Sequence, residues 1–302
     1  MAAALRIGIV GAGWIADKHL ETLAGLDGVE VVAVADLDEE RARKAAASSG
    51  ANAYGGTEEL LERERLDALF VCVPPLAHRE AVELALDRGV HVYLEKPVAR
   101  TVDDADAIVA AVERSGLVCA VGYQWHGLEL IEIVRQELEG QTIGLLSGRS
   151  IGPTMSRPWF LDQAQGGGNV LERGSHHIDL QRTLGGEVTS VRAAASSVPL
   201  GQAEGEAGNI ADALALELHF ASGALGSIQL AWTRGGLPGS YGLDIVATEA
   251  TIYLSLDPDF ALRGVSRGRE LAATAQQHPS ERTVQRFLEA VCAGDPGLVF
   301  CT

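Results

Sequence analysis

The chain contains little cysteine and no long apolar segment. Its four cysteines in 302 residues show neither the paired spacing of a metal site nor the density of a disulfide scaffold, so we expect reduced thiols, no metal and a cytoplasmic protein. No apolar run reaches the roughly 18 residues that a membrane helix needs. An apolar strand pattern starts at Leu5, and we therefore expect no signal peptide and no membrane as a partner.

Basic residues are also scarce. The chain has 24 Lys and Arg against 41 Asp and Glu, a formal net charge of −17, which argues against nucleic acid or an anionic membrane surface as a partner. An anionic cofactor is still compatible with this charge, because backbone N–H groups can bind it locally. With 47% hydrophobic residues, the composition is that of a globular protein, and the length suggests two domains.

The stretch around Gly11 has the pattern of a nucleotide-binding turn. The apolar run Ile7–Val10 stops at Gly11-Ala12-Gly13, and a helical pattern follows. Gly11 permits a sharp turn, Gly13 lets the backbone approach a pyrophosphate, and the helix N-terminus favours anions. We therefore expect cofactor contacts at consecutive residues: Gly11, Ala12, Gly13, Trp14 and Ile15. A tight turn without a ligand is the alternative.

An acidic residue ends the next apolar segment. Asp36 follows Val29–Ala35 and lies 25 positions after Gly11, near the place where such a unit presents an acid to the adenosine ribose. A loop carboxylate or a helix cap is the alternative reading. Because Leu37, and not an arginine, comes next, NAD is favoured over NADP.

Strand and helix patterns alternate up to about residue 123. This alternation predicts a doubly wound parallel sheet with helices on both faces, and we assign residues 1–123 to a dinucleotide-binding domain. Ligands gather at the carboxyl ends of such strands. Three further segments then fall on the same rim as the glycine turn: Pro74–His78, Glu95–Pro97 and Tyr123–His126.

Strand patterns without intervening helices dominate the second half. They occupy Leu145–Ile151, Val188–Val198, Ala211–Phe220, Leu225–Trp232 and Leu243–Leu254. We expect an α+β domain over residues 124–302, with a large, mostly antiparallel open sheet. A loop and helix, Trp159–Leu184, interrupt it, and Pro279–Ala293 is a last amphipathic helix.

Two places carry residues suited to proton transfer. Lys96 follows a buried strand at the mouth of the parallel sheet, where it could polarise a hydroxyl, although a solvated strand-end lysine is the alternative. If the segment after Gly166–Gly168 is helical, Glu172, His176 and Asp179 share one face, and His177 points about 100° away. A carboxylate one turn before His176 can hold its ring and suit it to acid–base work. A structural histidine and a metal site are the alternatives.

Taken in this order, these motifs are similar to those of the glucose–fructose oxidoreductase/inositol dehydrogenase (Gfo/Idh/MocA) family. The resemblance rests on Gly-Ala-Gly-Trp-Ile-Ala, Asp36, the Pro74-Pro75 pair with His78, Glu95-Lys96-Pro97, and the later glycine–histidine block. It extends from the N-terminus to about residue 295. It implies an N-terminal Rossmann domain and an NAD(P)-dependent oxidoreductase that acts on a sugar, inositol or related polyol.

The resemblance also implies roles for individual residues. Residues 11–16 would hold the pyrophosphate, and Asp36 the adenosine ribose. Lys96 would contact the reacting hydroxyl, His176 would be the general base, and Glu172 would orient it. Further cofactor contacts are implied along the rim, at Val73, Pro74, Pro75, His78, Glu95, Lys96 and Gln124.

Two departures from the family's pattern stand out. Glu172 occupies a place where members usually carry Asp, which bears on the substrate. Members also generally continue past Pro296 with a helix that packs on the first domain, whereas this chain ends at Thr302. A non-catalytic protein that senses NAD or a sugar, and a reductase of another carbonyl compound, are the alternative functions.

Substrate and subunit contacts are the remaining expectations. The substrate-facing candidates are Trp125, Arg157, Trp159 and His177, with aromatic rings suited to the apolar face of a sugar. The open sheet of the second domain would expose one face, and we expect a homodimer or homotetramer through it.

Overall fold

Two compact units make up the chain in the computed structural model. One comprises residues 1–123 with 280–302, and the other residues 124–279. The structure describes residues 4–154, 158–198, 209–233 and 239–301. The expected substrate residue Arg157 lies outside these described residues.

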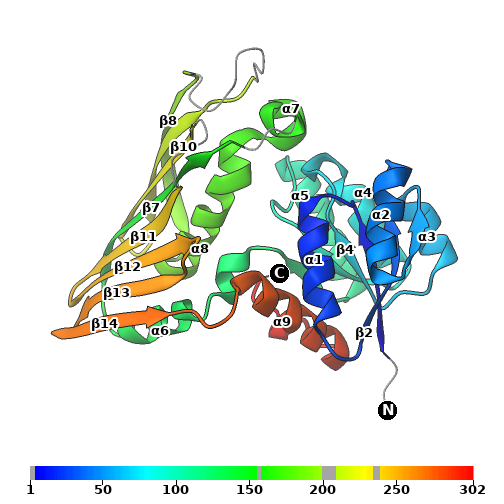
Figure 1. The fold of residues 1–302 in the computed structure, drawn as a ribbon. Helices are drawn as coiled ribbons and strands as arrows, with labels where there is room; N and C mark the ends of the chain where they lie inside the picture. The colour runs from blue at the N-terminus through cyan, green and yellow to red at the C-terminus, as the bar shows by residue number, and fades with distance from the viewer. Residues whose placement is uncertain (1–3, 155–157, 199–208, 234–238, 302) are drawn as a thin grey trace. The chain divides into compact units, whose positions relative to one another are not determined.

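The first unit holds a parallel six-stranded sheet in the order β3-β2-β1-β4-β5-β6. Its strands are β1 (Leu5–Val10), β2 (Val29–Ala35), β3 (Asn52–Tyr54), β4 (Ala68–Val71), β5 (His91–Leu94) and β6 (Cys119–Val121). Its helices between strands are α1 (Trp14–Ala24), α2 (Glu39–Ser49), α3 (Thr57–Arg63), α4 (His78–Asp87) and α5 (Val102–Ser115), and a short 3-10 turn, η1 (Pro75–Ala77), precedes α4. The doubly wound sheet expected from the sequence is confirmed (Figure 1).

Local chemistry sets the helix ends of this unit. The Asp38 side chain caps α2 by accepting from the N–H groups of Glu40 and Arg41, and Thr101 caps α5. Gly50 and Gly116 follow the same two helices with positive φ values of 72° and 64°, which glycine adopts without strain. The Asp38 side chain is therefore the N-cap of α2.

Helices cover both faces of the first sheet. On one face α3, α4 and α5 pack through residues such as Leu60, Val82 and Ile108. On the other face α1 packs together with the C-terminal helix α9 (Pro279–Ala293), whose Val284 and Phe287 are fully buried. A 3-10 turn, η5 (Pro296–Leu298), follows α9.

The position of α9 corrects the expected second domain of residues 124–302. Residues 280–302 return to the first unit, because the apolar side of α9 fills the core beside β1 and β4, where Phe287 packs edge-on against Phe70 at 5.7 Å and Tyr93 at 5.5 Å.

The second unit holds an eight-stranded sheet in the order β14-β13-β12-β11-β7-β10-β9-β8. Only β7 and β10 pair in parallel, and the other pairs are antiparallel. The strands are β7 (Ile143–Pro153), β8 (Val188–Ser196), β9 (Ala213–Phe220), β10 (Leu225–Thr233), β11 (Ser240–Ala247), β12 (Ala250–Asp257), β13 (Ala261–Ser266) and β14 (Arg269–Thr274). The long segment expected at Leu243–Leu254 is two strands, because the chain turns at residues 248–249 and β11 pairs with β12.

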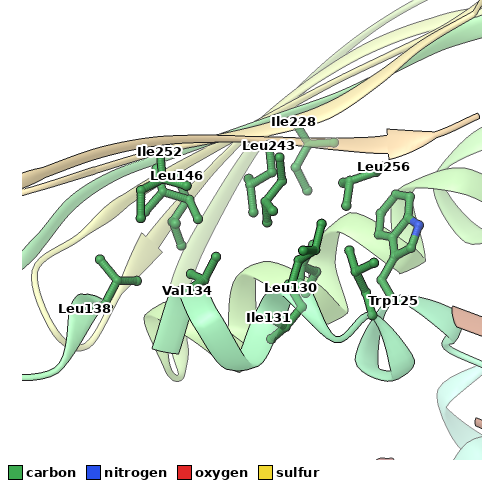
Figure 2. Close-up of a cluster of buried hydrophobic side chains, with 14 of the residues drawn as sticks. Trp125, Leu130, Ile131, Val134, Leu138, Leu146, Ile228, Leu243, Ile252 and Leu256 are labelled. Atoms are coloured by element: carbon green, nitrogen blue, oxygen red, sulfur yellow. The ribbon is translucent and has the colours of Figure 1, made fainter. Parts of the chain in front are cut away.

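Helices pack on one face of this sheet. The 3-10 turn η2 (Gln124–Gly127) leads into α6 (Leu130–Leu138), whose Leu130, Ile131 and Val134 meet the sheet residues Leu146, Ile228 and Ile252, as Figure 2 shows. The opposite face carries no helix in the described part of the chain, and Leu145, Leu225 and Val246 are exposed there.

The insertion between β7 and β8 is helical but irregular. It contains η3 (Pro158–Leu161), α7 (Gln163–Gly166), a π-helical turn η4 (Val170–Gly174) and α8 (Ser175–Gly185). None of the described helices is both long and apolar enough to cross a membrane.

Candidate active site

The glycine turn leaves the start of α1 open. Gly13 is the N-cap of α1, and no side chain accepts a hydrogen bond there. The N–H groups of the first turn of a helix have no partner within the helix. The neighbouring Trp14 is 50% exposed. The end of α1 thus presents backbone donors and the positive end of a helix dipole, a combination that favours a bound anion.

Gly11 and Gly13 have different reasons to be glycine. Gly11 has a φ of +87°, and a Cβ there would lie 2.5 Å from the carbonyl oxygen of Cys72, so the chain's own geometry requires glycine. A Cβ at Gly13 would meet no heavy atom within 4 Å. The open space over Gly13, beside the donors of α1, fits the pyrophosphate of a dinucleotide.

Asp36 is fixed at the end of β2, next to the glycine turn. Its Oδ2 accepts a hydrogen bond of 2.8 Å from the N–H of Ala12, and its Oδ1 accepts one of 2.8 Å from the N–H of Asp38. Arg41 Nη2 lies 3.2 Å from Oδ1. The carboxylate therefore joins the glycine turn to the start of α2, which is where a ribose acceptor is expected.

The loop after β4 places its histidine differently from the expectation. His78 is fully buried, with Nε2 2.9 Å from the Val73 carbonyl and Nδ1 3.2 Å from the Val98 carbonyl. Burial lowers the pKa of this imidazole below its usual value. The His78 ring thus holds two loops together inside the unit and is not open to a cofactor. Pro74 is exposed and Pro75 is buried.

Glu95 and Lys96, which follow β5, have different environments. Glu95 is 7% exposed, and its Oε1 lies 2.8 Å from His19 Nε2 of α1. Burial raises the pKa of this carboxyl, but the hydrogen bond and charge of His19, together with Lys96, outweigh it and hold the pKa below its usual range. Glu95 therefore points into the unit, whereas the resemblance implies a cofactor contact for it. Lys96 is partly exposed at the strand end.

His176 lies at the start of α8 beside an aromatic ring. The ring centroids of His176 and Trp125 are 5.1 Å apart, and Trp125 is only 4% exposed. Gln124 and His176 are partly buried. Trp125 thus packs beside His176 as a buried side chain, and it is less accessible to a sugar than we expected.

The two carboxylates expected beside His176 have different positions. Glu172 falls within the π-helical turn and is partly buried. Asp179 Oδ2 lies 2.6 Å from His126 Nε2, and the Thr183 hydroxyl is 3.2 Å from the same nitrogen. The shared face of Glu172, His176 and Asp179 was an α-helical expectation, and the π turn shifts its first member relative to the others.

His177 belongs to the core of the second unit. It is fully buried, its Nε2 lies 3.0 Å from Ser150 Oγ of β7, and its ring meets Trp125 edge-on at 4.8 Å. Burial lowers the pKa of His177 to about 4. The expected substrate contact of His177 is therefore wrong, because its side of α8 packs on the sheet.

Trp159 packs within a small satellite cluster. Its ring lies 4.4 Å from that of Phe160, in a group completed by Ile210 and Trp232. A Cβ at Gly166 would approach the Trp159 carbonyl oxygen to 2.7 Å. Trp159 remains partly exposed. Its close contact with Gly166 explains why residue 166 has no side chain.

Arg173 was not singled out in the sequence. From the π turn its guanidinium donates to the carbonyls of Gly152 and Pro153 at the end of β7 and lies 5.9 Å from the Trp232 ring. Burial lowers its pKa. Arg173 thus ties the turn that carries Glu172 to the sheet. A lone arginine in a glycine-rich segment gives no sequence signal for such a contact.

The sheet order, the open glycine turn and Asp36 define a Rossmann dinucleotide-binding protein. Residues 5–123 match the family model described as an oxidoreductase family with an NAD-binding Rossmann fold, and residues 142–253 match the GFO/IDH/MocA C-terminal domain. The chain belongs to the GFO/IDH/MocA oxidoreductase family, and its first unit is the NAD-binding domain.

Individual relatives act on different compounds. Myo-inositol 2-dehydrogenase of Thermotoga maritima is 30% identical over 226 residues, covering 74% of this chain and 67% of that protein. 4-Carboxy-2-hydroxymuconate-6-semialdehyde dehydrogenase of Sphingobium sp. is 28% identical, covering 78% and 75%. A solved levoglucosan dehydrogenase, in complex with NADH and levoglucosan, shares the fold with a TM-score of 0.87 at 20% identity, over 97% of this chain and 91% of that one.

Proposed function

We propose that the chain is an NAD-dependent dehydrogenase that oxidises a secondary alcohol of a sugar, an inositol or a related polyol. The observation that carries this proposal is family membership combined with a partly exposed lysine, Lys96, two residues after β5 in an NAD-binding domain. The inositol and levoglucosan dehydrogenases among its relatives support the substrate class.

The residues of the first unit would bind the cofactor and hold the substrate hydroxyl. The backbone at Gly11–Gly13 and the start of α1 would hold the pyrophosphate, and Asp36 the adenosine ribose. The nicotinamide supplies the hydride acceptor when bound. Lys96 would donate a hydrogen bond to the reacting hydroxyl and orient its carbon.

The residues of the second unit would handle the proton. His176 Nε2 or Nδ1 would accept the hydroxyl proton as general base, and the neighbouring Trp125 ring would help to keep the imidazole in place. Glu172 would orient His176. Its longer side chain, compared with the usual aspartate, is where we expect the substrate preference to differ from that of relatives.

A panel of polyols and sugars with NAD, followed by NADH absorbance, tests the proposal. We expect turnover on at least one compound, and a loss of about 10²- to 10⁴-fold in kcat in both Lys96→Ala and His176→Ala. Lys44→Ala, at an exposed site on α2, is the matched control and should retain activity. NAD binding without turnover of any compound would instead favour the sensor reading.

The panel should also include aldehydes with NAD and other carbonyl compounds with NADH. The semialdehyde dehydrogenase among the relatives makes an aldehyde or carbonyl substrate the second candidate. Turnover of such a compound, with none on polyols, would leave the oxidoreductase assignment in place and replace the substrate class.

We further propose a homodimer or homotetramer that forms through the helix-free face of the eight-stranded sheet. Leu225 and Val246 both pair with Leu145 across neighbouring strands, and their exposed fractions are 45%, 38% and 38%. Such an apolar row favours a second copy of the same face. Light scattering should give a smaller mass for Leu145→Glu and an unchanged mass for Val109→Glu on α5; a monomeric parent chain contradicts the proposal.

A cytoplasmic location is also proposed. Cys72 and Cys119 are buried free thiols, and Cys292 is an exposed free thiol. Free thiols are typical of a reducing compartment. Fractionation of the source cells with an antibody against the chain would test this location.

A further inference from the structure

A histidine on α1 reaches the residue that precedes Lys96. His19 is 3% exposed and Glu95 is 7% exposed, and His19 Nε2 donates to Glu95 Oε1 at 2.8 Å. The two residues are 76 positions apart in the sequence. One belongs to the helix that starts at the glycine turn, and the other to the end of β5, so this contact joins the two.

An aromatic enclosure fixes the His19 ring. Its centroid lies 5.2 Å from both Phe70 and Tyr93, at interplanar angles of 59° and 71°. Phe70 and Tyr93 stack on each other at 4.8 Å, and the Tyr93 hydroxyl is 3.0 Å from that of Thr283 on α9. These rings pack around the imidazole of His19, and its Nε2 faces the Glu95 carboxylate.

The second carboxylate oxygen of Glu95 contacts the backbone of Lys96. Glu95 Oε2 accepts a hydrogen bond of 3.2 Å from the backbone N–H of Lys96. On the opposite side, a Cβ at Gly122 would lie 3.1 Å from Oε1 and 3.2 Å from Oε2, so the bare glycine after β6 leaves the carboxylate just enough room. Each oxygen thus has a defined partner, one on α1 and one on the backbone of the next residue.

We propose that His19 and Glu95 form a positioning pair that fixes the backbone of Lys96 and hence the direction in which its amine leaves the strand end. This role rests on the proposed function, since it gives the lysine of that site its orientation. Neither residue needs to touch substrate or cofactor. A buried hydrogen-bonded charge is weak evidence for a stability role, because an apolar pair of equal volume stabilises as well; a positional role explains why the polar pair is there.

Three variants separate position from packing. His19→Leu removes the donor and keeps the volume, Glu95→Gln removes the charge and keeps the shape, and His19→Gln keeps a donor. We expect kcat to fall about 10- to 100-fold in His19→Leu and Glu95→Gln, with the NAD dissociation constant within about threefold, as displacement of a reacting group predicts. His19→Gln should recover most of kcat.

We expect the affinity for NAD to be unchanged in these variants, because other hydrogen bonds hold the glycine turn in place. Gly11 N–H donates to the Ala35 carbonyl at 2.8 Å, and Ala12 N–H donates to Asp36. His91→Gln is the matched control. His91 lies at the opposite end of β5 and accepts from the Val118 N–H at 2.9 Å, so its loss should lower stability and leave kcat unchanged.

A second readout does not require turnover. The chain has three lysines, Lys18, Lys44 and Lys96, so reductive methylation with carbon-13 gives few NMR resonances, and Lys96→Ala assigns the one of interest. His19→Leu and Glu95→Gln should move the Lys96 resonance, and Lys44 should stay in place as the internal reference.

These measurements decide between the outcomes. An unchanged kcat in folded His19→Leu and Glu95→Gln, or a lower kcat with an unmoved Lys96 resonance, overturns the positioning role. If His19→Leu does not fold, Glu95→Gln decides by the same two readouts. If the parent chain turns over no compound, the proposed function fails, while the Lys96 resonance still tests the pair.

Discussion

The Asp36 carboxylate accepts a 2.8 Å hydrogen bond from the backbone N–H of Ala12. A single side chain thus holds the glycine turn and also presents a negative charge where the adenosine ribose is expected. The same carboxylate has Arg41 Nη2 at 3.2 Å. The choice between NAD and NADP should therefore depend on the Asp36 charge, which repels a 2′-phosphate, and on Arg41, whose guanidinium could bind one.

Asp36→Asn should relax the preference for NAD over NADP. The amide oxygen can still accept from Ala12, but the charge that repels a 2′-phosphate is gone, and Arg41 is released from its ion pair. We expect the ratio of kcat/KM for NADP to that for NAD to rise at least about tenfold, equal to 1.4 kcal/mol.

Arg41→Ala in the Asp36→Asn background isolates the guanidinium. The gain in NADP use should shrink if Arg41 binds the added phosphate. An equal gain in both backgrounds would assign the whole effect to the lost carboxylate charge.

Gly13→Ala should weaken NAD binding without unfolding the protein. Gly13 has an extended backbone, with φ −92° and ψ −176°, and a Cβ there meets nothing in the protein; the added methyl would meet the pyrophosphate. Gly56→Ala is the control, since Gly56 is also an uncapped N-cap with φ −173° and free space around it. Calorimetry should give an unchanged melting temperature for both and an NAD affinity at least about tenfold lower for Gly13→Ala alone.

The first unit was predictable because its signals are local. The apolar runs that stop at Gly11 and Asp36, and the cap at Asp38, each lie within a few residues of what they determine. The second sheet was only partly predictable. The turn at residues 248–249 lies inside one apolar segment, and β13 and β14 alternate too weakly to stand out.

The site was less predictable than the fold, because its contacts join distant residues. The ring of His19 meets Glu95 across 76 positions, and the Arg173 guanidinium reaches the Gly152 carbonyl across 21 positions. No local pattern marks either pair. The π turn before His176 was also missed, because residue spacing alone predicts an α-helix there.

Burial of His177 should make the second unit sensitive to acid. Its folded pKa of about 4 lies below the ordinary value of 6.5, so the unfolded chain takes up a proton before the folded one does. The stabilising contribution of the neutral His177 is therefore complete above pH 6.5 and is lost as the pH falls from 6.5 to 4, on the order of 3 kcal/mol in total.

His177→Asn tests this pH dependence by removing the titration while keeping a partner for Ser150. We expect the variant to be less stable than the parent chain at pH 7 and the gap to narrow at pH 4.5, as measured by urea unfolding at both values. A gap that stays constant between the two pH values would show that His177 titrates alike in the folded and unfolded chains.

Arg173→Leu should loosen the π turn more than it unfolds the sheet. The substitution leaves the carbonyls of Gly152 and Pro153 with a lost donor at the end of β7, and we expect unfolding to become easier by about 2–3 kcal/mol. Glu172 lies on the same turn. We therefore expect kcat to fall in Arg173→Leu even under conditions where the variant and the parent chain are both fully folded. Arg192→Leu is the matched control, since Arg192 on β8 is 81% exposed and its nearest carboxylate, Glu217, is 3.9 Å away; it should change neither quantity. If Arg173→Leu lowers stability and leaves kcat at the level of the control, the arginine supports the sheet end alone and the orientation of Glu172 does not depend on it.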